Sequence, residues 1–435
     1  MVHRLLTTAR LDGRMSEAMQ PSAPARPPSA VSAGVGVAGV VGLMAWLVIA
    51  GHVGMDGPYA ALVALAWTAV PMIGWSLAVD KVHRRASTGI DWTLRRRGRE
   101  AVDVSLTKIA GLFATWGAIA LVYFTGRFYW QGNFAFAMWC LTWSVPVVAL
   151  LALPYVFWLD RRLVEPRDGA WHFGAWLTGQ AGWEAAAIQG HLRAWAVKGF
   201  FLAFMLAIVP GGYGALIRTD LRAALHDPAA LGQWLIALMF VVDVMIATVG
   251  YVLTLRPLDS HIRSANPFAA GWTAALMCYP PFILMETGGP FDYHPGTQEW
   301  TVWFQWHPWL LAGWGGLLVL LTAIYAWATV AFGLRFSNLT NRGILTHGPY
   351  ALSRHPAYLS KNLFWWASTL PILSTGGIVD AVRATLLMAV VSGIYYWRAK
   401  TEERHLGMDP EYQAYSAWMT RYGVVPRFFR WLTGR

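Results

Sequence analysis

The chain has 435 residues, of which 56% are hydrophobic and only 13% are charged. Together with a mean hydropathy of +0.40, this composition excludes an ordinary soluble globular protein. The net charge of +11 comes from basic residues that flank apolar runs, a pattern typical of membrane topology and of contact with anionic lipid headgroups. We therefore expect an all-α, multi-pass integral membrane protein with no nucleic-acid partner.

Residues 1–30 hold four arginines in a stretch rich in Ser, Ala and Pro, and we predict a disordered tail there. Apolar runs near the ~20 residues that cross a bilayer then recur along the chain. They cover residues 31–54, 58–79, 105–125, 134–159, 197–217, 231–255, 268–286, 309–332, 359–375 and 380–397. These runs predict about ten transmembrane helices, of which the last two form a helical hairpin. We divide the membrane part into a multi-span region, residues 31–334, and a C-terminal module, residues 335–435.

The basic residues lie mainly in alternate loops. If the N-terminus is inside, the opposite side keeps only a few of them, namely Arg127, Arg218, Arg222 and Arg383. Since Lys and Arg concentrate on the cytoplasmic side of membrane proteins, this bias predicts that both termini are cytoplasmic. We expect an integral protein of a bacterial inner (cytoplasmic) membrane.

A first polar segment, residues 348–358, interrupts the apolar sequence and contains Arg354-His355-Pro356. Proline is tolerated in the first helical turn, so Pro356 predicts the start of a helix. The free N–H groups of that helix end, with a basic side chain alongside, favour a carboxylate or phosphate ligand. The alternative is that Arg354 and His355 only anchor the helix to lipid headgroups.

A second polar segment, residues 398–403, follows the last predicted span. Arg398 and Glu402 are four residues apart, so on a helix they share a face and can pair, while Glu403 points about 100 degrees away. Two carboxylates beside a membrane groove can hold a ribose diol or an amino group. The alternative is a solvated helix end with an ordinary surface salt bridge.

The two segments together resemble the isoprenylcysteine carboxyl methyltransferase family, which is related to the phospholipid methyltransferases. The motifs in question are Gly348-Pro349-Tyr350, Arg354-His355-Pro356, Tyr358, Arg398, Glu402-Glu403, Leu406, Tyr412, Tyr415 and Pro426-Arg427. The resemblance covers roughly residues 335–430, about a quarter of the chain. The preceding spans have no counterpart in simple members of that family, so the resemblance does not identify the methyl acceptor.

The resemblance implies a membrane enzyme that binds S-adenosylmethionine between its last helices and its cytosolic tail. Carried over by position, the residues that would contact this cosubstrate are Tyr350, His355, Pro356, Tyr358, Glu402 and Glu403. Arg354 and Arg398 would serve the catalytic region or the acceptor. The implied chemistry requires no metal.

Three further polar residues are candidate acceptor contacts. Asp243 lies in the middle of the sixth apolar run, where an ionisable side chain is costly. Asp259 and His261 lie in a short loop on the same predicted side as the polar segments. The alternatives are a polar pair between helices for Asp243, and a hydrogen-bond network within the loop for the other two.

We therefore expect an S-adenosylmethionine-dependent membrane methyltransferase with a lipid-like or lipid-attached acceptor, either a prenylcysteine carboxylate or a lipid amine. One alternative is an NADPH-dependent membrane reductase of the sterol reductase type, although Gly348-Pro349-Tyr350 and Pro356 directly after His355 match the methyltransferases better. The other alternative is a transporter, which the small number of charges inside the spans disfavours.

Overall fold

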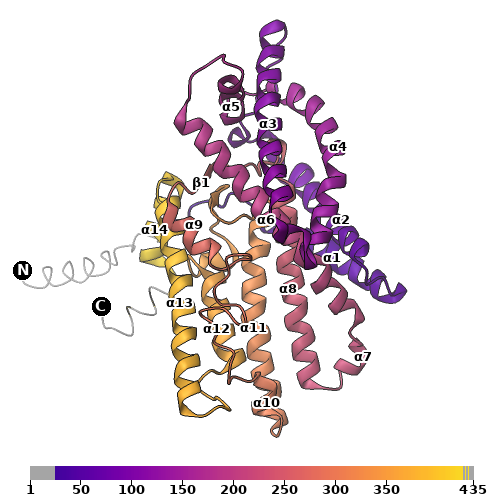
Figure 1. Cartoon of the computed structure of the whole chain (residues 1–435), viewed down its shortest axis with the longest axis vertical. Coiled ribbons are helices and arrows are strands. Elements are labelled where there is room, and N and C mark those ends of the chain that lie inside the picture. The colour runs from indigo at the N-terminus through magenta and orange to yellow at the C-terminus, as the bar shows by residue number, and fades with distance from the viewer. Residues whose placement is uncertain (1–24, 425–426, 428–429, 431–435) are drawn as a thin grey trace, which may run out of the picture.

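The computed structural model describes residues 25–424 together with Arg427 and Arg430, and this part of the chain is almost entirely helical. The expectation of an all-α membrane bundle is confirmed. Within the described residues, eight helices are long and apolar enough to cross a membrane. They are α1 (Ala33–Val53), α2 (Pro58–Gly74, continued by a π-helical turn to Val79), α3 (Arg99–Thr125), α4 (Gly132–Asp160), α6 (Ala185–Arg218), α8 (Pro228–Val252), α11 (Pro308–Phe332) and α13 (Ile378–Leu406) (Figure 1).

Shorter elements connect these helices. The short helices are α5 (Gly169–Leu177), α7 (Leu221–Ala224), α9 (Ala269–Leu276), α10 (Trp300–Phe304), α12 (Pro356–Thr369) and α14 (Pro410–Tyr422). Two strands of two residues each, β1 (Ser264–Ala265) and β2 (Thr340–Asn341), pair antiparallel. In this pairing Ser264 lies opposite Asn341, so the loop after α8 is joined to the loop after α11.

Two of the ten predicted spans are not long helices. In the run 268–286, helix α9 ends at Leu276, shortly before the consecutive prolines Pro280 and Pro281. Proline removes a backbone donor and clashes with the preceding turn, so a helix cannot continue through this pair. The run 359–375 falls partly in α12, which has only 14 residues.

The chain crosses this region as irregular backbone instead. Residues 277–299 pass between α9 and α10 alongside α12 and α13 (Figure 1). At one end Tyr279 lies 5.4 Å from the guanidinium of Arg398, near the end of α13. At the other end the Gly296 carbonyl accepts a hydrogen bond of 2.9 Å from the Thr375 amide, just before α13 begins. Non-helical backbone at membrane depth is tolerated where protein buries it, and α12 and α13 supply that cover.

Helices α12 and α13 form the predicted hairpin. Helix α12 ends where Leu370 adopts a left-handed conformation (φ 43°), and Pro371 follows directly. The two helices pack through Trp366, whose Nε1 donates to Ser392 Oγ at 3.0 Å. Helix α12 begins at Pro356, so this predicted helix start is confirmed.

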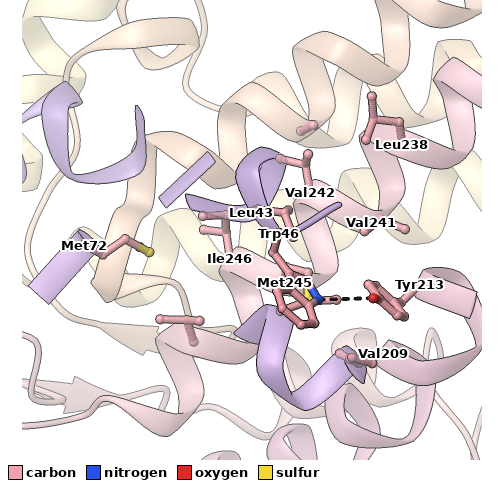
Figure 2. Close-up of a cluster of buried hydrophobic side chains, with 14 of the residues drawn as sticks. Leu43, Trp46, Met72, Val209, Tyr213, Leu238, Val241, Val242, Met245 and Ile246 are labelled. Atoms are coloured by element: carbon pink, nitrogen blue, oxygen red, sulfur yellow. Dashed lines mark hydrogen bonds between the residues drawn. The ribbon is translucent and has the colours of Figure 1, made fainter. Parts of the chain in front are cut away.

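The main core lies where α1, α2, α6 and α8 meet (Figure 2). Its buried side chains include Leu43, Met72, Val209, Val241, Val242, Met245 and Ile246. Trp46 of α1 donates from Nε1 to the hydroxyl of Tyr213 of α6 at 3.1 Å, so the polar atoms of both rings are satisfied within this apolar environment. Since lipid does not drive helices together, close packing of this kind stabilises the bundle.

The predicted disordered tail is only partly described, because residues 1–24 lie outside the described residues. Residues 25–30 do not fit that prediction, since they run along the chain before α12. The Ala30 amide donates to the Ile344 carbonyl at 2.9 Å, and Thr346 Oγ1 donates to the Pro27 carbonyl at 2.7 Å. Backbone and side-chain hydrogen bonds therefore hold this short segment in place.

The loops after α2, α8 and α11 meet at one end of the molecule, around the buried carboxylate of Asp259. Arg335 forms an ion pair with this carboxylate, Ser87 donates to it at 2.7 Å, and Arg85 lies 3.9 Å away. The prediction had put these loops on the same side of the membrane, and in the structure they are in direct contact.

Arg342 joins the same loops through backbone carbonyls. Its buried guanidinium donates to the carbonyls of Gly250, Leu253, Ser260, Leu334 and Phe336. The carbonyls of Gly250 and Leu253 belong to the C-terminal turn of α8, the negative end of that helix dipole. Burial and the nearby charge of Arg335 lower the pKa of Arg342 to about 9, so it remains a cation at neutral pH.

We predict that Arg342→Met destabilises the protein by at least about 3 kcal/mol, because it leaves buried carbonyls without donors. The melting temperature of the detergent-purified protein measures this loss. Arg383→Met is the matched control, since Arg383 is exposed on α13, and it should leave the melting temperature unchanged. Equal melting temperatures for the two variants would contradict the role of Arg342.

Candidate functional site

A cavity lies where the ends of α11 and α13 meet the start of α12. It encloses about 970 Å³ of empty space, including the part that opens to solvent. Both polar segments contribute to its wall, through Tyr350, Arg354, His355 and Tyr358 from the first and Arg398 and Glu402 from the second.

Glu403 ties the two segments together from behind the cavity wall. Its Oε1 lies 3.0 Å from His355 Nε2 and 3.4 Å from Arg354 Nη1, and its Oε2 lies 2.8 Å from Lys400 Nζ. Arg354 also donates to Ser416 Oγ of α14 at 3.0 Å. Three cationic or basic side chains therefore share this carboxylate. Glu403 fixes the start of α12 against the end of α13 and has little capacity left for a ligand.

Glu402 has a different environment from its neighbour. It lines the cavity, and within the described residues it has no ion pair. Its Oε2 accepts a hydrogen bond of 3.0 Å from the hydroxyl of Tyr358. The rest of this carboxylate is available to donors or cations of a ligand. Of the two predicted cosubstrate carboxylates, Glu402 is thus the one that borders the cavity.

The four-residue spacing had indicated that Arg398 can pair with Glu402, but the two side chains form no ion pair in the structure. Its guanidinium is buried and turns instead toward aromatic rings. It lies 5.2–5.4 Å from the ring centres of Tyr279, Tyr358 and Tyr395. A weak hydrogen bond of 3.4 Å to Asn338 Oδ1 is its one other polar contact in the described part of the chain. Cation–π attraction to three rings outweighs a helix-surface pair worth only about 0.3–0.5 kcal/mol.

Tyr350 and Pro356 have distinct places in the site. The Tyr350 ring lines the cavity and packs edge-on against Phe332 at 5.4 Å, while its carbonyl accepts from the Tyr415 hydroxyl at 2.7 Å. Pro356 is buried at the first position of α12 and does not line the cavity. Its contribution is therefore to the helix start that positions His355.

The candidate acceptor residue Asp243 lies behind the cavity wall. Its two carboxylate oxygens accept hydrogen bonds from Thr329 and Tyr325, the latter at 2.8 Å, and both donors line the cavity. Asp243 thus holds two wall residues of α11 in position from the neighbouring helix α8. This is the helix-to-helix polar contact that had been the alternative interpretation.

The other two candidate acceptor residues do not line the cavity either. Asp259 is held by Arg335 and Ser87 in the loop network described above. His261 is largely buried among four arginines, and its Nδ1 has no partner in the described structure. Burial, followed by the charges of Arg256, Arg263, Arg335 and Arg342, lowers the pKa of His261 to about 3, so its ring is neutral at pH 7. Both residues belong to the scaffold around the site.

Several wall residues were not predicted from the sequence. These are Asn266, Tyr279, Asn338, Lys361, Tyr395 and His405. A helical spacing could have identified three of them, because Tyr395, Arg398, Glu402 and His405 recur every three or four residues along α13, and Lys361 lies three residues after Tyr358 on α12. Tyr279 and the two asparagines come from irregular segments, for which no such periodicity exists. Within the described residues, no group of three or more His, Cys, Asp or Glu side chains could hold a metal ion.

The comparison with protein families gives one match. Residues 303–419 match a family model described as a protein of unknown function (DUF1295). No curated protein and no solved structure matches the chain. The matched region contains α11, α12, α13 and the loop between α11 and α12, and together these supply most of the residues that line the cavity.

The environment of His261 predicts a dependence of stability on pH. Its pKa in the folded protein is about 3, against 6.5 for the unfolded group, so between these values the unfolded chain binds a proton that the folded chain does not. We expect the melting temperature to fall as the pH drops from about 7.5 to about 5, and to fall less in His261→Gln. An identical pH dependence for both proteins would show that His261 is not held neutral.

Proposed function

We propose that the protein is a membrane methyltransferase that takes its methyl group from S-adenosylmethionine and transfers it to a lipid-like or lipid-attached acceptor. One observation carries the proposal. The two polar segments that resemble the isoprenylcysteine carboxyl methyltransferase family border one cavity and are bonded to each other through His355–Glu403 and Tyr358–Glu402. These pairs join residues 48 and 44 positions apart in the sequence.

The cosubstrate carries positive charge on its sulfonium and on its amino group. We assign these groups, or the ribose diol, to the carboxylate of Glu402, because it lines the cavity and the Tyr358 hydroxyl is its one side-chain partner among the described residues. The rings of Tyr350 and Tyr358 supply aromatic faces, which attract cations. In this proposal Glu403 acts indirectly, by holding His355 and Arg354 at the wall.

The transfer needs little chemistry from the protein. A lone pair of the acceptor forms a bond to the methyl carbon while the bond from that carbon to sulfur breaks, and the electron pair stays on the neutral thioether of S-adenosylhomocysteine. The rate then depends on alignment of the two reactants and on exclusion of water. A carboxylate acceptor has no proton to lose. An amine acceptor would have to lose one, and His355 is the wall residue that could take it.

The position of the cavity fits an acceptor that stays in the bilayer. Part of the wall comes from the ends of α11 and α13, which are long and apolar enough to span a membrane, and Leu359 and Leu363 of α12 are exposed. We propose that the acceptor enters sideways between helices while the cosubstrate enters from the cytoplasm. The concentration of basic residues in the loops at this end supports the cytoplasmic assignment.

A nicotinamide-dependent reductase is the alternative function that an experiment must distinguish from the methyltransferase. The DUF1295 family is associated both with steroid 5-alpha reductase-like and with isoprenylcysteine methyltransferase-like membrane proteins. Charge alone does not distinguish the two functions, because Glu402 attracts a sulfonium or ammonium group while Lys361 and Arg398 of the same cavity attract phosphates such as those of NADPH.

We predict that the detergent-purified protein binds S-adenosylmethionine, measured by calorimetry, and that Glu402→Gln and His355→Ala each reduce the affinity at least tenfold. The loss of one charge-assisted contact, about 1.5–3 kcal/mol, corresponds to this factor. Glu411→Gln is the matched control, because this glutamate is exposed on α14 away from the cavity, and it should bind as the natural protein does.

NADPH is the parallel ligand in the same experiment. Binding of NADPH without binding of S-adenosylmethionine would replace the proposed function by the reductase. Binding of neither ligand, in protein that melts cooperatively, would contradict both enzymatic assignments and favour a transporter.

A further inference from the structure

Two cations lie side by side in the wall of the cavity. Lys361 of α12 points its Nζ toward the rings of Tyr325 and Trp365, at 5.2 and 5.1 Å from their centres. Arg398 of α13 lies over its own set of tyrosines, as described above. Both cations contact Tyr395, with Lys361 Nζ 5.8 Å and Arg398 Cζ 5.2 Å from its ring centre. One tyrosine ring thus links two positive charges.

Neither cation forms a direct ion pair within the described residues. Within the described residues, no carboxylate lies within 4.0 Å of Lys361 or Arg398, and Lys361 makes no hydrogen bond to another residue. The carboxylate of Asp243 on the neighbouring helix acts on Lys361 through its charge from beyond 4.0 Å, while its oxygens accept hydrogen bonds from Tyr325 and Thr329. Aromatic faces attract cations but accept no strong hydrogen bonds, so the N–H donors of Lys361 and those of Arg398 other than the one that meets Asn338 remain available.

Two cations among aromatic side chains, with no directly paired carboxylate and only the charge of Asp243 nearby, are costly unless a ligand completes the site. Charges taken out of water lose several kcal/mol each, and an opposite charge that also accepts their hydrogen bonds restores much of this loss. The group that fits two neighbouring cationic donors is a carboxylate or a phosphate, both of which accept charge-assisted bonds from Arg and Lys. Ionisable residues in such a position within a membrane bundle commonly mark a ligand site.

We propose that Lys361 and Arg398 form a subsite for the anionic headgroup, carboxylate or phosphate, of a membrane amphiphile. The identification of that amphiphile with the methyl acceptor rests on the proposed function; the anion site itself does not. Tyr358 separates this subsite from the carboxylate of Glu402, since its hydroxyl bonds Glu402 while its ring lies 5.2 Å from Arg398. The cavity therefore has an acidic part and a basic part on either side of one tyrosine.

The same arrangement disfavours a lipid amine as the ligand of the basic part. An ammonium headgroup would meet two positive charges there and would be repelled. The apolar part of an anionic amphiphile has aromatic surface beside the cations, since the Trp365 ring contacts Lys361 and faces a second cavity together with Phe364 and Phe240.

The test is binding of radiolabelled amphiphiles to the full chain in lipid nanodiscs, with empty nanodiscs subtracted. The probes are dodecanoate, dodecyl phosphate, dodecanol and dodecyltrimethylammonium. We expect saturable binding of one or both anions, with dodecanol and the cation at least about tenfold weaker, as expected for the loss of one charge-assisted interaction. A preference for dodecanoate or for dodecyl phosphate identifies the source of the anion. Equal affinity for dodecanoate, dodecyl phosphate and dodecanol, or a preference for the cation, would overturn the inference without the need for any variant.

Variants of Lys361 then test whether this residue contributes to anion binding. Lys361→Met should weaken anion binding about tenfold, whereas Lys361→Arg, which keeps the charge, should retain most of it. Arg383→Met is the control, because it removes an exposed cation near the other end of α13. Anion binding that Lys361→Met leaves unchanged would overturn the assignment.

Binding of S-adenosylmethionine, measured in the same nanodiscs, separates the two proposals. Lys361-dependent anion binding in a protein that does not bind S-adenosylmethionine would leave the subsite standing and refute the methyltransferase. Binding of S-adenosylmethionine without any preference for anions would support the methyltransferase and refute the anion subsite.

Discussion

The guanidinium of Arg342 holds together the part of the chain on which the site depends. It is buried where the C-terminus of α8, the loop after it and the start of the loop after α11 converge, and each hydrogen bond it makes to the described part of the chain ends on a backbone carbonyl. Carbonyls at a helix end have no partners within the helix, and a buried cation supplies several donors to them at once. Its fixed position determines the path of the chain from α11 to α12. That path carries Asn338, Tyr350 and His355 to the cavity.

Around this fixed loop, the cavity is divided by charge. Glu402 lies on one side of Tyr358, and Arg398 and Lys361 lie on the other. The division suits a reaction between two unlike molecules. A cationic methyl donor and an anionic amphiphile would each meet complementary charge, and the two would be held with the reacting atoms near the tyrosine between them. Substrate alignment of this kind accounts for much of the rate of a group transfer that requires no acid, base or metal.

The sequence predicted those features that depend on local composition. Long apolar runs predicted the eight long helices, because a bilayer requires about 20 apolar residues from any span. Pro356 predicted the start of α12 for a similarly local reason. The run 268–286 was equally apolar, but Pro280 and Pro281 prevent a helix, and irregular backbone is stable there only because α12 and α13 cover it. That cover is a tertiary effect and leaves no trace in the segment itself.

The candidate site shows the same limit. The spacing of Arg398 and Glu402 was compatible with a salt bridge, yet three tyrosines, one of them 119 positions earlier in the sequence, draw the guanidinium away. The adjacent residues Glu402 and Glu403 could not be distinguished by sequence, because the difference between them arises from His355, Arg354 and the helix direction. Lys361 lies near the start of an apolar run, and nothing in the surrounding sequence distinguishes it. Its significance depends on its position beside Arg398 across the ring of Tyr395, which only the fold reveals.

The central claim is that the two polar segments form one cosubstrate site. Ultraviolet cross-linking of radiolabelled S-adenosylmethionine to the membrane-embedded protein, followed by mapping of the labelled peptides, tests it most directly. The account predicts label in peptides that contain residues 348–358 and 398–406, and loss of that label when excess unlabelled S-adenosylhomocysteine competes. Competable label confined to the region before residue 303, where the DUF1295 match begins, would contradict it.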